Sequence, residues 1–175
     1  MDPFCGSGTL LIEAALRAKN IAPGLNREFA GEHFDFLKEA FRTEKENARK
    51  AIRDEVGFRA VGSDTDPEAI RNAKENAARA GVGDLIDFWV ADAVKVRIPD
   101  GATVVANPPY GERLMTPEAV EKLYREFSKN YARQKAAGLY VISSFPGFEK
   151  VFGKTANKRR KLYNGMIPAT LYMYF

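Results

Sequence analysis

A chain of 175 residues with 45% hydrophobic side chains is long enough for one domain with a sizeable core. Its formal net charge of +4 permits a polyanionic partner without requiring one. A single cysteine excludes an internal disulfide framework, and a single histidine, His33, excludes most zinc sites and catalytic triads. Because no stretch approaches ~20 apolar residues and no signal peptide is recognisable, we expect a cytoplasmic protein without a membrane or metal partner.

The first third of the chain combines a glycine-rich turn, a helix and an insertion. The turn over residues 2–9 leads directly into a helix predicted at 9–18. Aromatic and turn-forming residues at about 20–42 then predict an insertion that packs over the domain. Residues 43–55 are charged with spaced apolar positions, which predicts an amphipathic helix capped by Thr43.

From residue 58 onward, strand and helix patterns alternate. The tail differs, because residues 158–164 and 168–175 predict an antiparallel hairpin. Alternation of this kind predicts an α/β domain over residues 1–175, with a mostly parallel sheet covered on both faces and the hairpin at one end. The predicted strands lie at 58–64, 85–91, 102–106 and 138–143, and the predicted helices at 67–80 and 117–136.

The opening turn has the character of a cradle for a nucleotide-type cofactor. Gly6 and Gly8 allow a tight turn and a close approach of backbone to ligand. The helix that starts near Thr9 presents free N–H groups and the positive end of its dipole. A plain strand-to-helix connection remains the alternative for this turn taken alone.

Two carboxylates follow the next predicted strands, at the sheet edge where ligands bind in open α/β sheets. Asp66 directly precedes Pro67 and is the better helix cap, which leaves Asp64 to accept hydrogen bonds from ribose hydroxyls. Asp92 ends the following strand. It either accepts a hydrogen bond from an adenine amino group or caps its own loop.

The sharpest motif is Asn107-Pro108-Pro109-Tyr110 after a buried strand. Consecutive prolines stop strand pairing and hold the backbone extended and rigid. The carbonyls of the Asn107 side chain and of Pro108 can both accept from a planar NH2 group, which aims the nitrogen lone pair at an electrophilic methyl group. Tyr110 can stack on the base that carries the amine. A turn with a packed tyrosine is the alternative.

Basic residues near the hairpin form the candidate contact with nucleic acid. Lys158, Arg159 and Arg160, followed by Lys161, either grip phosphates or protect a solvated strand edge. Arg113, just after the proline motif, is expected to contact the substrate or the loop.

Together these segments carry a family resemblance. Residues 2–9, 62–67 and 107–114 resemble the motifs of class I S-adenosylmethionine-dependent methyltransferases that modify exocyclic amines. More narrowly, residues 20–24 and 161–165 with the long proline motif resemble an RNA methylase family. It includes large-subunit ribosomal RNA guanine-N2 methyltransferases, and its members were often labelled adenine-specific DNA methylases.

The resemblance implies a Rossmann-like fold, S-adenosylmethionine as cofactor and methylation of a base amine in RNA, with guanine N2 of large-subunit ribosomal RNA expected. DNA adenine-N6 methylation, protein glutamine methylation and an inactive cofactor-binding scaffold are the alternatives. Residues 107–110 would hold the target base. The implied cofactor set is Asp2, Phe4, Gly6, Gly8, Thr9, Asp64, Thr65, Asp92, Ala93 and Asn107.

The resemblance also implies elements upstream of this sequence. Family members carry an RNA-binding THUMP domain and then the first strand of the sheet, which is central in the order 3-2-1-4-5-7-6. Only Met1 precedes the turn here. We therefore expect that a partner chain or an upstream segment fills the central position, that strands two and four draw together, or that the domain is marginally stable.

Overall fold

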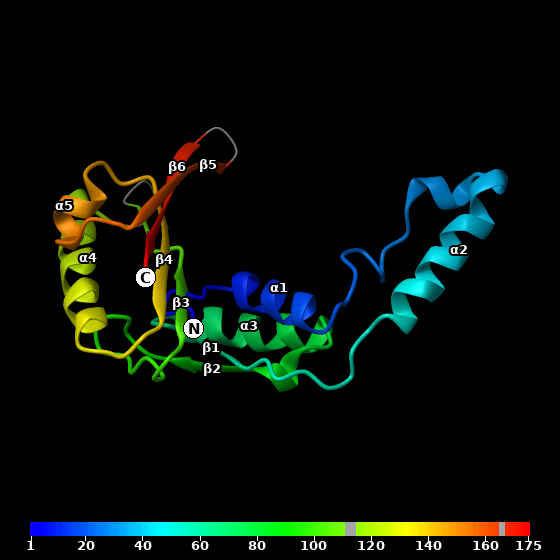
Figure 1. Ribbon diagram of the computed structural model, residues 1–175, viewed down its shortest axis with the longest axis horizontal. Helices are drawn as coiled ribbons and strands as arrows, with labels where there is room; N and C mark the ends of the chain where they lie inside the picture. Colours follow the sequence, from blue (N-terminus) through cyan, green and yellow to red (C-terminus); the bar gives the residue numbers. More distant parts are fainter. Residues whose placement is uncertain (111–114, 165–166) are drawn as a thin grey trace.

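The computed structural model describes residues 1–110, 115–164 and 167–175, and within them the strands form two sheets (Figure 1). In the first sheet, β1 (Ala60–Asp64) pairs in parallel with β2 (Ile86–Val90). The second sheet has the order β3-β4-β6-β5 and is parallel only between β3 and β4, so the predicted antiparallel hairpin is confirmed. Its strands are β3 (Thr103–Ala106), β4 (Gly138–Ser143), β5 (Lys158–Asn164) and β6 (Ile167–Tyr174).

Met1 and Asp2 join the two sheets. Backbone N–H groups of Asp2 and Val105 donate to the carbonyls of Val61 and Met1, both at 2.9 Å, and Ser63 N–H donates back to the Asp2 carbonyl. The overall order is therefore β2, β1, Met1–Asp2, β3, β4, β6, β5, which matches the order implied by the family resemblance. The alternative that strands two and four draw together is wrong, because the backbone of two residues separates β1 from β3.

Two of the three long helices of the domain begin at a capping side chain. α1 (Thr9–Ala18) has the predicted bounds. The side chain of Asp66 accepts from the first turn of α3 (Pro67–Arg79), and Thr116 does the same for α4 (Pro117–Ala132). Three short helices among the described residues were not predicted from the sequence, namely η1 (Ala30–His33), η2 (Gly83–Leu85) and α5 (Phe148–Phe152).

Two hydrophobic cores lie on the two sheets. The two-stranded half (β1, β2, α1 and α3) has a mainly aliphatic core, with Leu11 and Ile70 beside one aromatic side chain, Phe88. The four-stranded half (β3 to β6, α4 and α5) has an aromatic core in which Phe148 stacks on Phe152 at 5.2 Å between ring centroids. Figure 1 shows α4 and α5 beside each other along this second sheet.

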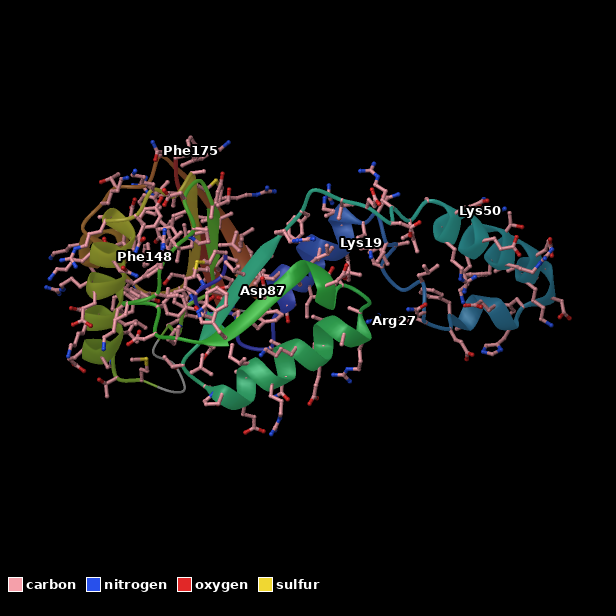
Figure 2. All side chains as sticks on the ribbon, turned by 90° about the horizontal axis from the view of Figure 1, so that it is seen from below. Lys19, Arg27, Lys50, Asp87, Phe148 and Phe175 are labelled. Carbon is pink, nitrogen blue, oxygen red and sulfur yellow. The ribbon has the colours of Figure 1, made fainter. Side chains whose placement is uncertain are left out.

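The insertion forms an arm that stands apart from the domain. It consists of η1 (Ala30–His33) and α2 (Asp35–Lys50), and α2 has no buried residue. Figures 1 and 2 show α2, with Lys50 at its end, well separated from the sheets. The arm holds itself together instead, through Phe29 stacked on Phe41 and Lys45 paired with Glu32 at 2.7 Å.

Two predictions about this region are therefore wrong. The insertion does not pack over the domain, because its aromatic residues pack on one another. The helix begins at Asp35 rather than at Thr43, because the charged pattern continues upstream with ion pairs between neighbouring turns, such as Lys38 with Asp35. No helix of the described residues is both long and apolar enough to cross a membrane.

Candidate cofactor and acceptor site

The predicted site segments converge at one edge of the sheets. Met1–Asp2, β1, β2 and β3 run parallel as neighbours, so the segments that follow them leave at the same edge. These segments are residues 3–8, 65–66, 91–94 and 107–110. The four sequence motifs are thus neighbours in space.

The glycine turn is shaped by conformation and by close packing. Gly8 has φ of 85°, and a Cβ there would lie 3.0 Å from the ring of Phe88 and 3.2 Å from Ala73. Gly6 also has positive φ, but its added Cβ would meet nothing within 4 Å, so its open side is available to a ligand. Burial raises the pKa of the Cys5 thiol to about 12, which keeps this thiol protonated and unreactive.

Asp64 is fixed across the mouth of the turn. One of its carboxylate oxygens accepts from Gly6 N–H at 3.0 Å and the other from Asp66 N–H at 3.1 Å. Asp66 caps α3 by accepting from Glu68 N–H at 2.8 Å, as predicted. Asp64 is therefore positioned by two backbone amides, and each oxygen keeps a second lone pair that a ribose hydroxyl can use.

Asp2 is a buried carboxyl beneath the same turn. It is 2% exposed and accepts from Phe4 N–H at 3.0 Å. Burial raises its pKa to about 6, and the neighbouring Asp64 adds to that rise. A ligand cation close to this pair would relieve the cost of the two carboxylates. A cradle with these two carboxylates thus fits a ligand that carries positive charge.

Three other residues of the predicted cofactor set form no hydrogen bond with the Asp64 carboxylate among the described contacts. The ring of Phe4 packs edge-to-face on Phe127 in the aromatic core, with 5.2 Å between centroids. Thr9 starts α1 and its hydroxyl lies 3.3 Å from that of Ser7. Thr65 is exposed beside Asp64. Phe4 therefore anchors the turn, while Thr9 and Thr65 present polar groups at the edge.

The loop after β2 uses Asp92 in its own structure. The carboxylate accepts from Val94 N–H at 3.0 Å, so the capping interpretation of Asp92 is confirmed without excluding a ligand. Ala93 is buried in the core, and its carbonyl accepts from the side chain of Asn130 at 2.9 Å. The side chain of Ala93 therefore faces the protein.

The proline motif, residues 107–110, directly follows β3, and we name it the acceptor loop after its predicted role. Pro108 is buried, Asn107 is exposed, and the Tyr110 hydroxyl donates to the side-chain oxygen of Asn107. Both predicted side chains thus face the same space. An incoming amine would share the Asn107 oxygen with this hydroxyl or displace it.

Tyr124 on α4 supports the acceptor loop from inside the protein, and sequence reasoning missed it. Its side chain is fully buried, and its hydroxyl donates to the Pro109 carbonyl at 2.8 Å and lies 3.1 Å from the hydroxyl of Ser143. Burial raises the pKa of Tyr124 to about 12, so the hydroxyl remains a donor at neutral pH. No local pattern distinguishes it, because a tyrosine on an amphipathic helix resembles any core residue.

The basic residues of the hairpin divide by face. Arg159 pairs with Glu149 of α5 through two hydrogen bonds of 2.8 and 2.9 Å. Lys158 and Arg160 are exposed on the alternate face of β5. Arg113 lies outside the described residues. The described residues contain no group of three or more histidine, cysteine or acidic side chains that could hold a metal ion.

Comparisons with known proteins give a consistent picture. A family model described as UPF0020, RMKL-like, methyltransferase domain matches residues 1–173. YpsC of Bacillus subtilis (strain 168), provisionally named an RNA methyltransferase, is 38% identical over all of this chain and 46% of its own length. Ribosomal RNA large subunit methyltransferase K/L of Aliivibrio salmonicida is 42% identical over 99% of this chain and 26% of its own length.

Solved structures agree with the sequence relatives. SMU.472, described as a methyltransferase and complexed with SAH, matches with a TM-score of 0.93 and 34% identity, over 99% of this chain and 47% of that one. A predicted N6-adenine-specific DNA methylase from Listeria monocytogenes matches with a TM-score of 0.89 and 44% identity, over 99% and 45%. The chain thus spans about half or less of the length of these relatives.

Proposed function

Because the chain belongs to the UPF0020 family of RMKL-like methyltransferase domains, we propose that it is the catalytic part of an S-adenosylmethionine-dependent RNA methyltransferase. The target we propose is the exocyclic amine of a base, namely guanine N2 of large-subunit ribosomal RNA. The ribosomal RNA methyltransferases among its relatives support the RNA substrate. SAH in the complex of SMU.472 supports the cofactor.

One observation carries the proposal. Met1–Asp2 lies between β1 and β3 and brings the glycine turn, Asp64 and Asn107 to one edge of the sheets. The methyl donor and the acceptor amine must meet at such an edge for an in-line transfer. The fixed Asp64 carboxylate suits the ribose of the cofactor, and the buried Asp2 carboxylate favours its cationic methionine part.

The residues of this chain supply orientation rather than a strong base. S-adenosylmethionine, when bound, supplies a methyl group on a sulfonium, which is already a good leaving group. The side-chain oxygen of Asn107 and the carbonyl of Pro108 would accept from the target amine and stabilise the positive charge that develops on its nitrogen. Tyr110 would stack on the base. Tyr124 holds the Pro109 carbonyl and keeps the loop in place.

Contact with the RNA backbone would come from exposed basic side chains. Lys158 and Arg160 lie on the edge strand β5, and we assign them to phosphates. Arg159 is already paired with Glu149, so its first role is to join α5 to β5. Arg113 remains a proposed substrate contact on the strength of its place after the acceptor loop.

Adenine N6 of DNA is the second candidate. The similar Listeria monocytogenes protein, which is described as a predicted N6-adenine-specific DNA methylase, favours it. An adenine amine also presents the same planar NH2 group to Asn107. An inactive scaffold that only binds the cofactor is the non-enzymatic alternative. The modified nucleoside distinguishes the three.

The test is radiolabelled methyl transfer to undermodified large-subunit ribosomal RNA and to duplex DNA. The chain is compared with a version extended upstream, because we also propose that an upstream segment or a partner chain completes the sheet beside Met1–Asp2. We expect N2-methylguanosine in RNA, with higher activity for the extended version. Methylation of DNA alone, or of neither nucleic acid by the extended version, would contradict the proposal.

A further inference from the structure

A cavity of about 300 Å³ lies between the loop after β4 and the β5–β6 hairpin. Its volume is at the lower end of the range for ligand pockets, which suits a single nucleotide better than a larger ligand. The acceptor loop contributes none of the described residues that line it. The residues that define its chemistry are Ser143, Phe145, Lys161, Tyr163, Thr170 and Tyr172.

Strand register places the polar groups of the cavity in one line. Thr170 of β6 pairs with Lys161 of β5 on one side and with Ser143 of β4 on the other. Directly paired residues point to the same face of a sheet, so these three side chains lie across the cavity floor together. Two residues along β5, Tyr163 points to the same face.

Charge in the cavity favours an anion. Lys161 is exposed, and the described lining contains no carboxylate. The nearest acidic side chain on α5, Glu149, already accepts two hydrogen bonds from Arg159. The Lys161 ammonium, on its flexible side chain, has no carboxylate beside it in the described lining and is therefore suited to bind a phosphate.

Aromatic surface in the cavity favours a base. Tyr163 is 75% exposed, so its ring is accessible to a base that enters the cavity. Phe145 also lines the cavity and packs edge-to-face on Tyr124, with 5.6 Å between ring centroids. An exposed aromatic ring in a positively charged groove is a surface on which the bases of single-stranded nucleic acid stack.

One hydroxyl connects the cavity to the acceptor loop. Tyr124 donates to the Pro109 carbonyl at 2.8 Å, and its oxygen lies 3.1 Å from the hydroxyl of Ser143 on the cavity floor. Ser143 in turn accepts from Phe145 N–H at 3.1 Å on the cavity wall. The Tyr124 hydroxyl thus contacts both the Pro109 carbonyl and the Ser143 hydroxyl, so the cavity and the acceptor loop are adjacent.

We propose that this cavity binds the nucleotide next to the target nucleotide in a single-stranded stretch of RNA. Lys161 contacts its phosphate, Tyr163 stacks on its base, and the Thr170 hydroxyl is placed to bond its ribose 2′-hydroxyl. This inference rests on the proposed function for the choice of RNA. It adds a second binding site, which recognises the nucleotide beside the target nucleotide rather than the target nucleotide itself.

The test compares Lys161→Gln and Tyr163→Ala with Lys74→Gln, a substitution of an exposed lysine on α3 in the other half. Two quantities are measured on one labelled single-stranded fragment of undermodified large-subunit ribosomal RNA. They are the dissociation constant, by fluorescence anisotropy over a salt series, and methyl transfer from S-adenosylmethionine. Melting temperatures confirm that both variants fold.

We expect Tyr163→Ala to weaken binding about tenfold. Lys161→Gln should reduce the slope of log affinity against log salt by about 1. Lys74→Gln should change neither. If Lys161→Gln and Tyr163→Ala bind like Lys74→Gln, the cavity is not an RNA site, whether or not methyl transfer occurs. If their binding is weakened but the wild-type chain and its extended version transfer no methyl group, the proposed function fails while this site stands.

Discussion

The two halves of the domain position their chemical groups by different means. In the two-stranded half, backbone amides hold the carboxylate of Asp64, and a glycine turn defines the cradle. In the four-stranded half, a buried tyrosine hydroxyl holds the backbone of the acceptor loop. Backbone contacts of this kind would suit a flexible cofactor, and support from an aromatic core would suit a loop that we propose orients the target amine.

This difference predicts where each half is vulnerable. Substitutions in the cradle should change stability and cofactor affinity, because the cradle depends on a left-handed glycine backbone and on a buried carboxyl group. Substitutions around the acceptor loop should act on the rate of methyl transfer, because the cradle does not depend on them.

The largest effect is expected for Asn107→Ala in the acceptor loop. Loss of the amide oxygen should reduce kcat for methyl transfer about 10²- to 10³-fold, because an acceptor aimed at the developing charge is removed. Affinity for S-adenosylmethionine should change less than the rate does. Asn72→Ala, at an exposed asparagine on α3, is the control. Wild-type turnover by Asn107→Ala would show that the acceptor lies elsewhere.

Next in size is the pH dependence caused by Asp2. Its pKa is about 6 in the folded protein and 3.8 as an ordinary value, so the folded state holds a proton that the unfolded state has released between these pH values. The free energy of unfolding should therefore fall by about 2.4 kcal/mol as pH rises from 4 to 7. Urea denaturation at both pH values should show this loss in the wild type and not in Asp2→Asn. Equal pH dependence of the two proteins would contradict it.

A smaller loss of stability is expected for Gly8→Ala in the cradle. The left-handed backbone and the contact with Phe88 should together cost about 2 kcal/mol, measured by thermal unfolding. Gly81→Ala is the matched control, because Gly81 also has positive φ but its added Cβ would meet nothing within 4 Å. It should cost about 1 kcal/mol from conformation alone. Identical losses would mean that packing at Gly8 is unimportant.

The smallest effect is expected for Tyr124→Phe. Removing one hydroxyl should cost about 1 kcal/mol of stability and lower kcat by up to about tenfold, while the KM for S-adenosylmethionine stays unchanged. Tyr131→Phe on the same helix is the control and should leave kcat unchanged. A fall in stability with wild-type kcat would limit Tyr124 to a structural role.

Local signals in the sequence were sufficient where a residue acts through its own neighbours. The helix at Thr9–Ala18 was predicted with correct bounds, and the cap at Asp66 and the hairpin were also correct. The arm was mispredicted, because aromatic residues look like core residues whichever surface they pack against. Phe29 packs on Phe41 within the arm rather than on the domain.

The sequence by itself determined the order of the strands and of the domain's three long helices, because each depends on local backbone preferences and on hydrophobic period. It also predicted four motifs for the site. Only the tertiary structure showed that the backbone of Met1 and Asp2 lies between β1 and β3 and forms hydrogen bonds with both strands. It alone showed Tyr124 beneath the acceptor loop and Lys161 in line with Thr170 and Ser143. Those contacts join residues far apart in the chain, and no local pattern records which distant partner a buried hydroxyl or a strand residue will meet.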